Sequence, residues 1–205
     1  RVVPWLDEVC READHSRLDP CIRTGAPVAV GNISELACAL DCHAMAEIRE
    51  CIPLHNDYAV SALVNSGACG VWLNSELTLA EIAHIAENAS VPVGYLVSGR
   101  IRTMTSEHCV LMTTGKCIHD CDTCKLRQEP HYLRGIDNDY LPVTTDTQGR
   151  SRIWAPQPFD AVPELDVLLA HGVTRLMVDA TLLTKEQTKR AVARVASAVA
   201  AVKQG

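Results

Sequence analysis

Four of the ten cysteines of this chain lie close together in the stretch EHCVLMTTGKCIHDCDTCKL, which runs from Glu107 to Leu126. Their spacing is C-x7-C-x3-C-x2-C, so a flexible loop can turn the sulfurs toward one point. Gly115 lies between the first two cysteines and permits a tight bend. Thiolates gathered in this way are metal ligands. The spacing therefore predicts a metal centre with four ligands, Cys109, Cys117, Cys121 and Cys124.

Two metal chemistries fit this spacing. Zinc held by four thiolates usually takes them from two C-x2-C pairs, and here only Cys121 and Cys124 form such a pair. A four-iron four-sulfur cluster accepts unequal spacings between its cysteine ligands. A disulfide is a third interpretation, but it requires an oxidising compartment that no other feature of the sequence indicates. Spacing alone leaves iron–sulfur and zinc both open.

Two histidines flank these cysteines, and six further cysteines are scattered through the chain. His108 and His119 are interpreted as loop residues or as hydrogen-bond donors to a sulfur, although each could replace a cysteine as a ligand. Cys38 and Cys42 lie one helical turn apart and could form part of a second site. The scattered thiols are otherwise expected to pack as small hydrophobic side chains; they are Cys10, Cys21, Cys38, Cys42, Cys51 and Cys69.

The composition favours an α/β fold. Hydrophobic residues make up 47% of the 205 residues and aromatic residues only 4%, so aliphatic side chains supply most of the apolar bulk. A formal net charge of −6 argues against a chain that binds nucleic acid by itself. Between Arg100 and Arg134, however, the basic residues outnumber the acidic ones by two. An anionic substrate is therefore expected in the region that carries the cysteines.

The sequence has no run of apolar residues long enough to span a membrane. The first ten residues, RVVPWLDEVC, do not have the pattern of a signal peptide and do not begin with Met. We therefore expect no membrane contact and a cytoplasmic location.

Short apolar runs alternate with helical patterns along most of the chain. Strands are expected at residues 25–32, 51–56, 70–75, 91–99 and 173–180, with helices following them. Thr78 with Glu81 and Thr184 with Gln187 form capping boxes, and Gly67 and Gly172 are placed to end helices. The alternation stops between Arg100 and Phe159, where YLPVTTD and SRIWA predict a small β-hairpin.

This pattern predicts three segments: βα units over residues 1–99, a Cys-rich metal-binding insertion over 100–158, and a final βα unit with a C-terminal helix over 159–205. Parallel strands covered by helices are typical of α/β proteins. A (β/α)8 TIM-type barrel needs eight strands and only five are visible, so we expect a partial barrel that begins partway through the fold. Its exposed strand edges predict self-association, or contact with missing domains of a longer parent chain. The alternative is a complete five-stranded doubly wound domain, although no G-x-G-x-x-G or Walker motif follows a strand.

Several ordered motifs resemble the collagenase-like peptidase family, U32. They are NDYAVSALVNSGACGVWLNSELTLAEI, GRIRTMTSEHC, the GKC…C segment, DTQGRSRIW and LLAHGVTRLMVD, and together they cover about residues 28–183. The resemblance implies a (β/α)8 barrel domain whose cysteines, in several members, hold a four-iron four-sulfur cluster. It also implies oxygen-independent hydroxylation of ribosomal RNA, transfer RNA or ubiquinone precursors, whereas other members carry the label of collagenase or protease.

The sequence departs from the best-known signature of that family. The signature has a Glu five positions before the strand-ending glycine and a Cys about three positions after it. Here Gly94 stands in the Glu position and Cys109 lies ten residues beyond Gly99. The match is therefore to a different branch, and which cysteines bind the cluster stays open.

In a barrel, chemistry takes place where the strands end. The residues at these ends are Asn32, Asn56, Glu76, Arg100 and Asp179. Glu76 could act as a general base, Arg100 could clamp a carboxylate or phosphate, and Asn56 could orient the ring being modified. Each also has a structural interpretation, as a residue that stabilises a helix N-terminus, a turn residue or a surface charge.

Three functions follow from these observations. The first is an iron–sulfur-dependent hydroxylase that acts without oxygen on an RNA base or on an aromatic or quinone precursor. The second is a metal-dependent protease, but no H-E-x-x-H or G-x-S-x-G motif occurs and a metal bound by four thiolates has no position for water. The third is a non-catalytic, metal-stapled fragment of a larger protein.

Overall fold

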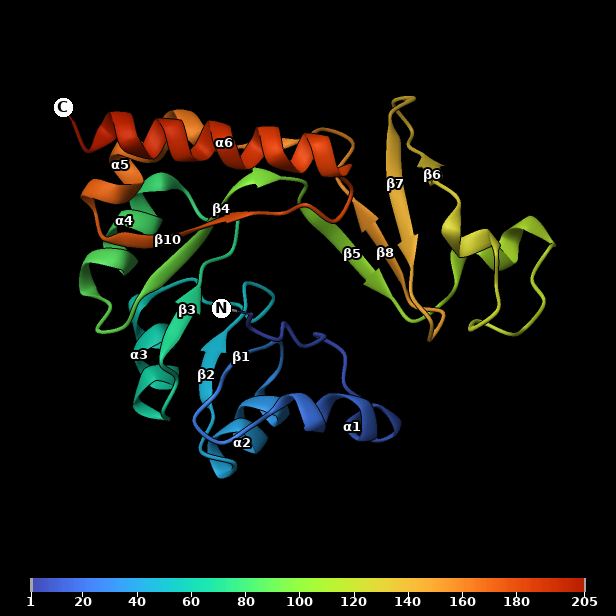
Figure 1. Cartoon of the computed structure of the whole chain (residues 1–205), viewed down its shortest axis with the longest axis horizontal. Helices are drawn as coiled ribbons and strands as arrows, with labels where there is room; N and C mark the ends of the chain where they lie inside the picture. The colour runs from blue at the N-terminus through green and yellow to red at the C-terminus, as the bar shows by residue number, and fades with distance from the viewer. Residues whose placement is uncertain (1, 205) are drawn as a thin grey trace. The chain divides into compact units, whose positions relative to one another are not determined.

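The computed structural model describes residues 2–204, which form two compact units (Figure 1). The first, here called the parallel unit, contains the described residues up to Val97 together with Ala161–Val178 and the residues from Thr184 on. The second, here called the antiparallel unit, contains Ser98–Asp160 and Asp179–Leu183. Each is built around its own sheet.

The parallel unit confirms the α/β fold. Its strands are β1 (Pro27–Val30), β2 (Met45–Ile48), β3 (Gly70–Trp72), β4 (Val93–Gly99) and β10 (Val173–Val178), hydrogen-bonded in that order. The pairs β1–β2, β2–β3 and β3–β4 are parallel. Buried strands of this kind need a crossover between neighbours, and helices supply it. Closure into a barrel stays a prediction.

The helices begin where the capping residues indicate. They are α1 (Glu12–Leu18), α2 (Ile33–Asp41), α3 (Asp57–Asn65), α4 (Leu79–Asn88), α5 (Leu165–Ala170) and α6 (Lys185–Val202), with short 3-10 turns η1 (Asp19–Cys21), η2 (Val110–Thr114), η3 (Leu126–Gln128) and η4 (Val162–Glu164). The two predicted capping boxes, at Thr78 and Thr184, are both formed. Gly67 and Gly172 have positive φ angles of 114° and 99°, as helix-ending glycines do.

The expected strand at residues 51–56 is wrong. Strand β2 lies earlier, at Met45–Ile48, because α2 ends at Asp41 and His43 turns the chain with a φ of 54°. Helix and strand follow each other without a glycine or proline, so the apolar pattern reads as one long helix. Ile52 and Leu54 are buried although they lie in a loop, which explains why their segment resembles a strand.

The outer edge of β1 is also paired. The Leu6 N–H donates to the Ala29 carbonyl and the Ala29 N–H donates to the Pro4 carbonyl, both at 2.8 Å. Trp5 and Ala29 form a parallel bridge between these bonds. The N-terminal segment therefore covers part of an edge that we expected to be exposed, whereas self-association itself stays a prediction.

One face of the parallel sheet carries a buried carboxylate. Glu47 on β2 accepts a hydrogen bond from Trp72 Nε1 on β3 at 3.1 Å and pairs with Arg175 Nη1 on β10 at 2.7 Å. Two glycines make room for these long side chains. A Cβ on Gly70 would lie 3.2 Å from Arg175 Nη1, and a Cβ on Gly94 would overlap the Trp72 ring. The lack of a side chain at Gly70 and at Gly94 thus leaves room for Arg175 and Trp72 to reach Glu47.

The antiparallel unit contains a four-stranded sheet in the order β5-β8-β7-β6. Its strands are β5 (Arg102–Ser106), β6 (His131–Arg134), β7 (Tyr140–Thr145) and β8 (Ser151–Trp154). The predicted hairpin is the β7–β8 pair, and β5 and β6 extend it on both sides. A two-residue strand, β9 (Phe159–Asp160), pairs with the end of β4.

Among residues 2–204, no helix is both long enough and apolar enough to cross a lipid bilayer.

The packing of Trp72 over Gly94 gives a first prediction. Gly94→Ala should lower the free energy of unfolding by about 1–3 kcal/mol, because the new methyl group forces the ring to move. In a Trp72→Leu background the same change should cost much less, since the overlapping ring atoms are gone. Urea unfolding of both single variants and the double variant measures this coupling. Equal costs in the two backgrounds would contradict it.

Candidate metal centre

The four predicted cysteines line one pocket in the antiparallel unit. Its volume is about 170 Å³, and its walls include the apolar side chains of Leu111, Met112, Ile118 and Leu126 as well as Cys109, Cys117, Cys121 and Cys124. On the same measure of volume, a cavity needs roughly 10–15 Å³ to hold one water molecule. The pocket therefore has room for a group larger than a single ion.

Local turns hold the cysteines at this pocket. Gly115 ends η2 in the left-handed conformation with a φ of 69°, which reverses the chain after Cys109. The Asp120 carboxylate accepts the Thr123 hydroxyl at 2.7 Å and the backbone N–H groups of Asp122 and Thr123 at 3.2 and 3.4 Å. This turn carries the C-x2-C pair. The hydrogen bonds from Thr123 also hold the pKa of Asp120 below its usual value.

The sulfurs affect one another electrostatically. Burial raises the pKa of the Cys121 thiol, and the neighbouring Cys109, Cys117 and Cys124 raise it further. The His119 N–H donates to Cys117 Sγ at 3.4 Å, from a residue with a φ of 56°. An N–H donor to a cysteine sulfur is one of the features that tune iron–sulfur sites. His119 therefore acts here as a donor to sulfur through its backbone.

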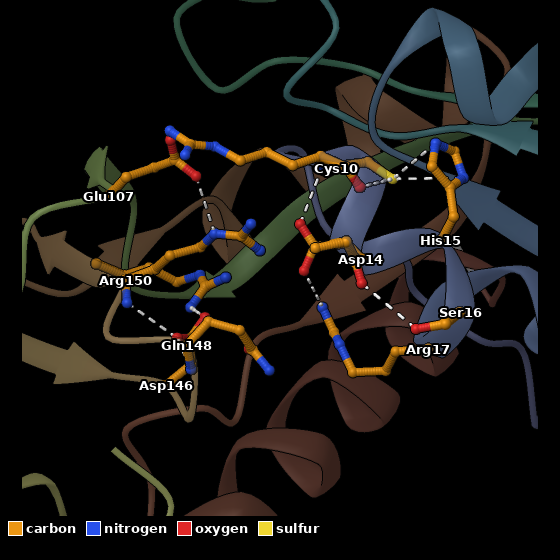
Figure 2. A network of polar contacts seen from close by, with 12 residues as sticks. Cys10, Asp14, His15, Ser16, Arg17, Glu107, Asp146, Gln148 and Arg150 are labelled. Atoms are coloured by element: carbon orange, nitrogen blue, oxygen red, sulfur yellow. Dashed lines mark hydrogen bonds and ion pairs between the residues drawn. The ribbon is translucent and has the colours of Figure 1, made fainter. Parts of the chain in front are cut away.

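The turn between β7 and β8 forms a second wall of the pocket, and Figure 2 shows its polar contacts. Asp146 Oδ1 accepts the N–H groups of Gln148 and Arg150, both at 2.9 Å, and its Oδ2 pairs with Arg152 Nη1 at 3.0 Å. This arrangement places Gly149, with a φ of 78°, against the cysteines. A Cβ on Gly149 would lie 3.2 Å from Cys121 Sγ.

The same turn is tied to the start of the cysteine loop. Ser151 is fully buried, and its hydroxyl accepts the N–H of Val110, the residue after Cys109, at 3.0 Å. The buried Arg150 side chain pairs with Glu107 at 3.3 Å (Figure 2). Sequence reasoning missed these supporting residues. The D-x-x-G pattern inside DTQGRSRIW was the available signal, because Asp and Gly at that spacing favour a tight turn.

The residues of the pocket fit an iron–sulfur cluster in their chemistry. Four thiols, an apolar wall and an N–H donor to sulfur are the components that such clusters require. Within residues 2–204, however, no group of three or more His, Cys, Asp or Glu side chains is already gathered around one point. Binding would therefore draw the thiols together, as is common where metal binding is coupled to folding.

Three of the predicted catalytic residues lie in the parallel unit, and each has a local structural contact. Asn32 and Asn56 cap α2 and α3, where their side chains accept the N–H groups of Glu35 and Ala59 at 2.9 Å. Glu76 follows β3 and is exposed, and its N–H donates to the Asn74 side chain at 2.8 Å. Their catalytic roles stay predictions.

The other two lie in the antiparallel unit. Arg100 Nη1 donates to the carbonyl groups of Ala155 at 2.8 Å and Pro156 at 2.5 Å, so this guanidinium clamps the chain that follows β8. Asp179 accepts the Thr181 N–H at 2.8 Å, and its own N–H donates to Ser98. It also packs against Gly99, where a Cβ would lie 2.7 Å from the Asp179 side chain. Their roles in catalysis likewise stay predictions.

The structure thus combines a parallel α/β unit with an antiparallel unit that carries a four-cysteine pocket. Comparison with family models identifies the family, because the model of peptidase family U32 matches residues 26–205. The chain belongs to this family. Searches of curated proteins and of solved structures found no significant match.

Two glycines in the antiparallel unit allow a matched test of the pocket wall. Gly149→Ala and Gly115→Ala both place a side chain at a positive φ, which costs roughly 1–2 kcal/mol. Only the Gly149 variant also pushes against Cys121, since no atom lies within 4 Å of a Cβ on Gly115.

We expect Gly149→Ala to be less stable than Gly115→Ala in urea and to lose bound metal in preparations where Gly115→Ala keeps it. Equal metal content in the two variants would show that the turn does not position Cys121.

Proposed function

We propose that this chain is an iron–sulfur enzyme of the hydroxylase type, which acts without molecular oxygen on an aromatic ring such as an RNA base or a quinone precursor. The observation that carries the proposal is the pocket lined by Cys109, Cys117, Cys121 and Cys124. The chain belongs to family U32, which supports the proposal, because the resemblance to this family implies such enzymes among its members.

The spacing of the cysteines is compatible with zinc as well as with an iron–sulfur cluster. The resemblance to family U32, several members of which hold a four-iron four-sulfur cluster, favours the cluster. When bound, such a cluster accepts and donates single electrons at a potential set by its surroundings.

The protein's own residues supply those surroundings. Leu111, Met112 and Ile118 line the pocket, and of the three Leu111 is buried. Apolar side chains around a cluster influence its redox potential. Arg127 also lines the pocket, and its Nε is buried without a hydrogen-bond partner among the described residues. Its Nη2 donates to the Asp122 carbonyl at 3.2 Å, which holds the guanidinium beside the C-x2-C turn. This positive charge offsets the negative charge of the thiolates.

The first test is iron and sulfide analysis of protein purified without oxygen. We expect about four irons and four sulfides per chain, as in a four-iron four-sulfur cluster. Cys117→Ser should lose most of both, because it removes a pocket thiol. Cys69→Ser, which removes a thiol of the parallel unit, should keep them. One zinc per chain and no sulfide would contradict the proposal.

The second test addresses the reaction. Hydroxylation without O2 needs another oxidant, so the assay supplies an organic oxygen donor of the hydroxylated carboxylic acid class, which gives up one oxygen atom and is reduced by two electrons. With this donor and under anaerobic conditions, protein with a full cluster should convert an RNA or a phenolic quinone precursor into a product heavier by one oxygen atom, as measured by mass spectrometry. The Cys117→Ser variant is the control for the pocket. Peptide release from gelatin is measured for the unaltered chain and for the Cys117→Ser variant. If both release peptides at the same rate, the chain is instead a protease whose activity does not need the pocket.

A further inference from the structure

The four-stranded sheet of the antiparallel unit has two faces of different chemistry. Successive residues of a strand point to opposite faces, and residues paired across neighbouring strands point to the same face. The pairing of β5 with β8, of β8 with β7 and of β7 with β6 therefore assigns the paired residues to faces. One face carries Val143, Ser151 and Ile153, which are all buried. Ser151 holds the cysteine loop on this side of the sheet.

The opposite face, here called the arginine–tyrosine face, collects every arginine, tyrosine and tryptophan of the four strands. Arg102 is paired with Trp154, and Arg134 is paired with Tyr140. No residue of the four strands is acidic, so nothing on the strands themselves offsets this positive charge. The six residues are Arg102, Tyr132, Arg134, Tyr140, Arg152 and Trp154.

The end of this face that β6 and β7 form is exposed. At the other end, Trp154 is 5% exposed and Arg152 pairs with Asp146, so these two residues hold the sheet together. Tyr132 and Tyr140 are instead 58% and 60% exposed. They lie at the edge of the sheet, which β6 forms (Figure 1). Exposed rings contribute little to a core, and rings gathered on one surface indicate a binding site.

The positions of the two tyrosines suit stacking against two bases. Tyr132 is paired with Pro142, and Tyr140 lies two residues before Pro142, so the tyrosines are diagonal neighbours on one face. Diagonal neighbours in an antiparallel pair are about 7–8 Å apart. Each ring can therefore receive one base of the same nucleic-acid strand. Aromatic side chains on a four-stranded sheet bind single-stranded RNA in this way in RNA-recognition domains.

Arg134 supplies a positive charge beside the rings. It is paired directly with Tyr140. Its Nε donates to Asn138 Oδ1 at 3.0 Å, and this neutral amide orients the guanidinium without neutralising its charge. The acidic residues of the hairpin, Asp137 and Asp139, lie in its turn and not on the strands. Positive charge for the backbone and aromatic rings for the bases are the combination that binds single-stranded nucleic acid.

We propose that Tyr132, Arg134 and Tyr140 bind single-stranded RNA, with a base on each tyrosine and a phosphate on the arginine. The formal net charge of −6 belongs to the whole chain, whereas the four strands carry three arginines and no acidic residue. The local charge is therefore complementary to RNA although the total charge is not.

The arginine–tyrosine face is connected to the cysteine pocket. Strand β6 follows the C-x2-C turn, and His131 Nε2 at its start lies 2.6 Å from the carbonyl oxygen of Leu126, which lines the pocket. The inference rests on the proposed function in one respect, because it selects RNA over a free quinone precursor as the substrate class. The binding itself needs no cluster.

Fluorescence anisotropy of the full chain with a labelled single-stranded RNA of about 12 nucleotides tests the proposal. Tyr132→Ala and Tyr140→Ala should each raise the Kd about 5–100-fold, because each removes the ring under one base. Tyr132→Phe should keep the affinity, since stacking needs the ring and not the hydroxyl group. Tyr58→Ala is the matched control. Tyr58 lies on α3 in the parallel unit and is 83% exposed, so its removal should leave the Kd unchanged.

Salt dependence separates the phosphate contact from stacking. Arg134→Ala should lower the slope of log Kd against log salt concentration by about 0.7, the contribution of one phosphate in a single strand. Tyr132→Ala should leave this slope unchanged. A duplex of the same RNA should bind more weakly than the single strand, because its bases are already stacked on one another.

The result is distinguishable from that of the proposed function. Cys117→Ser should lose the cluster and still bind the RNA with an unchanged Kd, so RNA binding is tested even in a chain that holds no iron. Two results would overturn the proposal: no binding of single-stranded RNA by the unaltered chain, or the same Kd for Tyr132→Ala, Tyr140→Ala and Tyr58→Ala. Either would leave the exposed tyrosines to a protein partner.

Discussion

The parallel sheet depends most directly on the contacts that the Glu47 carboxylate makes with two other strands. Glu47 lies on β2 and is bound by Trp72 on β3 and by Arg175 on β10. The Glu47 side chain is 11% exposed and that of Arg175 is 35% exposed, so removing the guanidinium would leave a largely buried carboxylate without its cation. The strands must therefore present Gly70 and Gly94 to the face that Glu47 occupies. One carboxylate thus specifies which strands share that face.

The same contact favours a curled sheet. Strands β3 and β4 lie between β2 and β10 in the sheet order. In a flat sheet, three strand spacings of roughly 4.8 Å would separate the two backbones by about 14 Å. Glu47 and Arg175 would have to extend fully along the sheet to meet across that distance. Curvature toward this face shortens the path, which agrees with the prediction of a partial barrel.

The antiparallel unit uses a carboxylate in a similar way. Asp146 has both oxygens occupied by donors of its own turn and of β8, so the turn has little freedom to change shape. Because Gly149 touches Cys121 and Ser151 holds the residue after Cys109, two cysteines far apart in the sequence rest on this one turn. A loop with few helical or strand residues can then keep its thiols at one pocket.

Local sequence signals predicted the elements that depend on local contacts. The capping boxes at Thr78 and Thr184 and the turn at Gly115 follow from residue types within four positions of one another, and each is present. The four pocket cysteines were predictable for the same reason, because their spacing is short. The same signals placed the second strand at the wrong residues. Strand β2 has four residues and closely follows α2, so the apolar pattern shows no break between them.

Long-range contacts were outside the reach of local signals. Glu47 reads as a helical surface residue in the sequence, and only the pairing of β2 with β3 shows that it is buried. The contact of Ser151 with Val110 joins segments that are separated by other elements. No pattern within a short window contains both members of such a pair. The residues that support the cysteine pocket were therefore found only in the structure.

Hydrolysis and electron transfer place opposite demands on a metal site. A hydrolytic metal must keep one position open for water, whereas a cluster held by four thiolates works best with water excluded. The cysteine pocket offers four sulfurs, and a metal bound by all four would have no open position, so the pocket does not meet the first demand. The peptidase label of the family and the redox chemistry proposed for the pocket therefore need not refer to the same atoms, and any hydrolysis by this chain should be independent of Cys117.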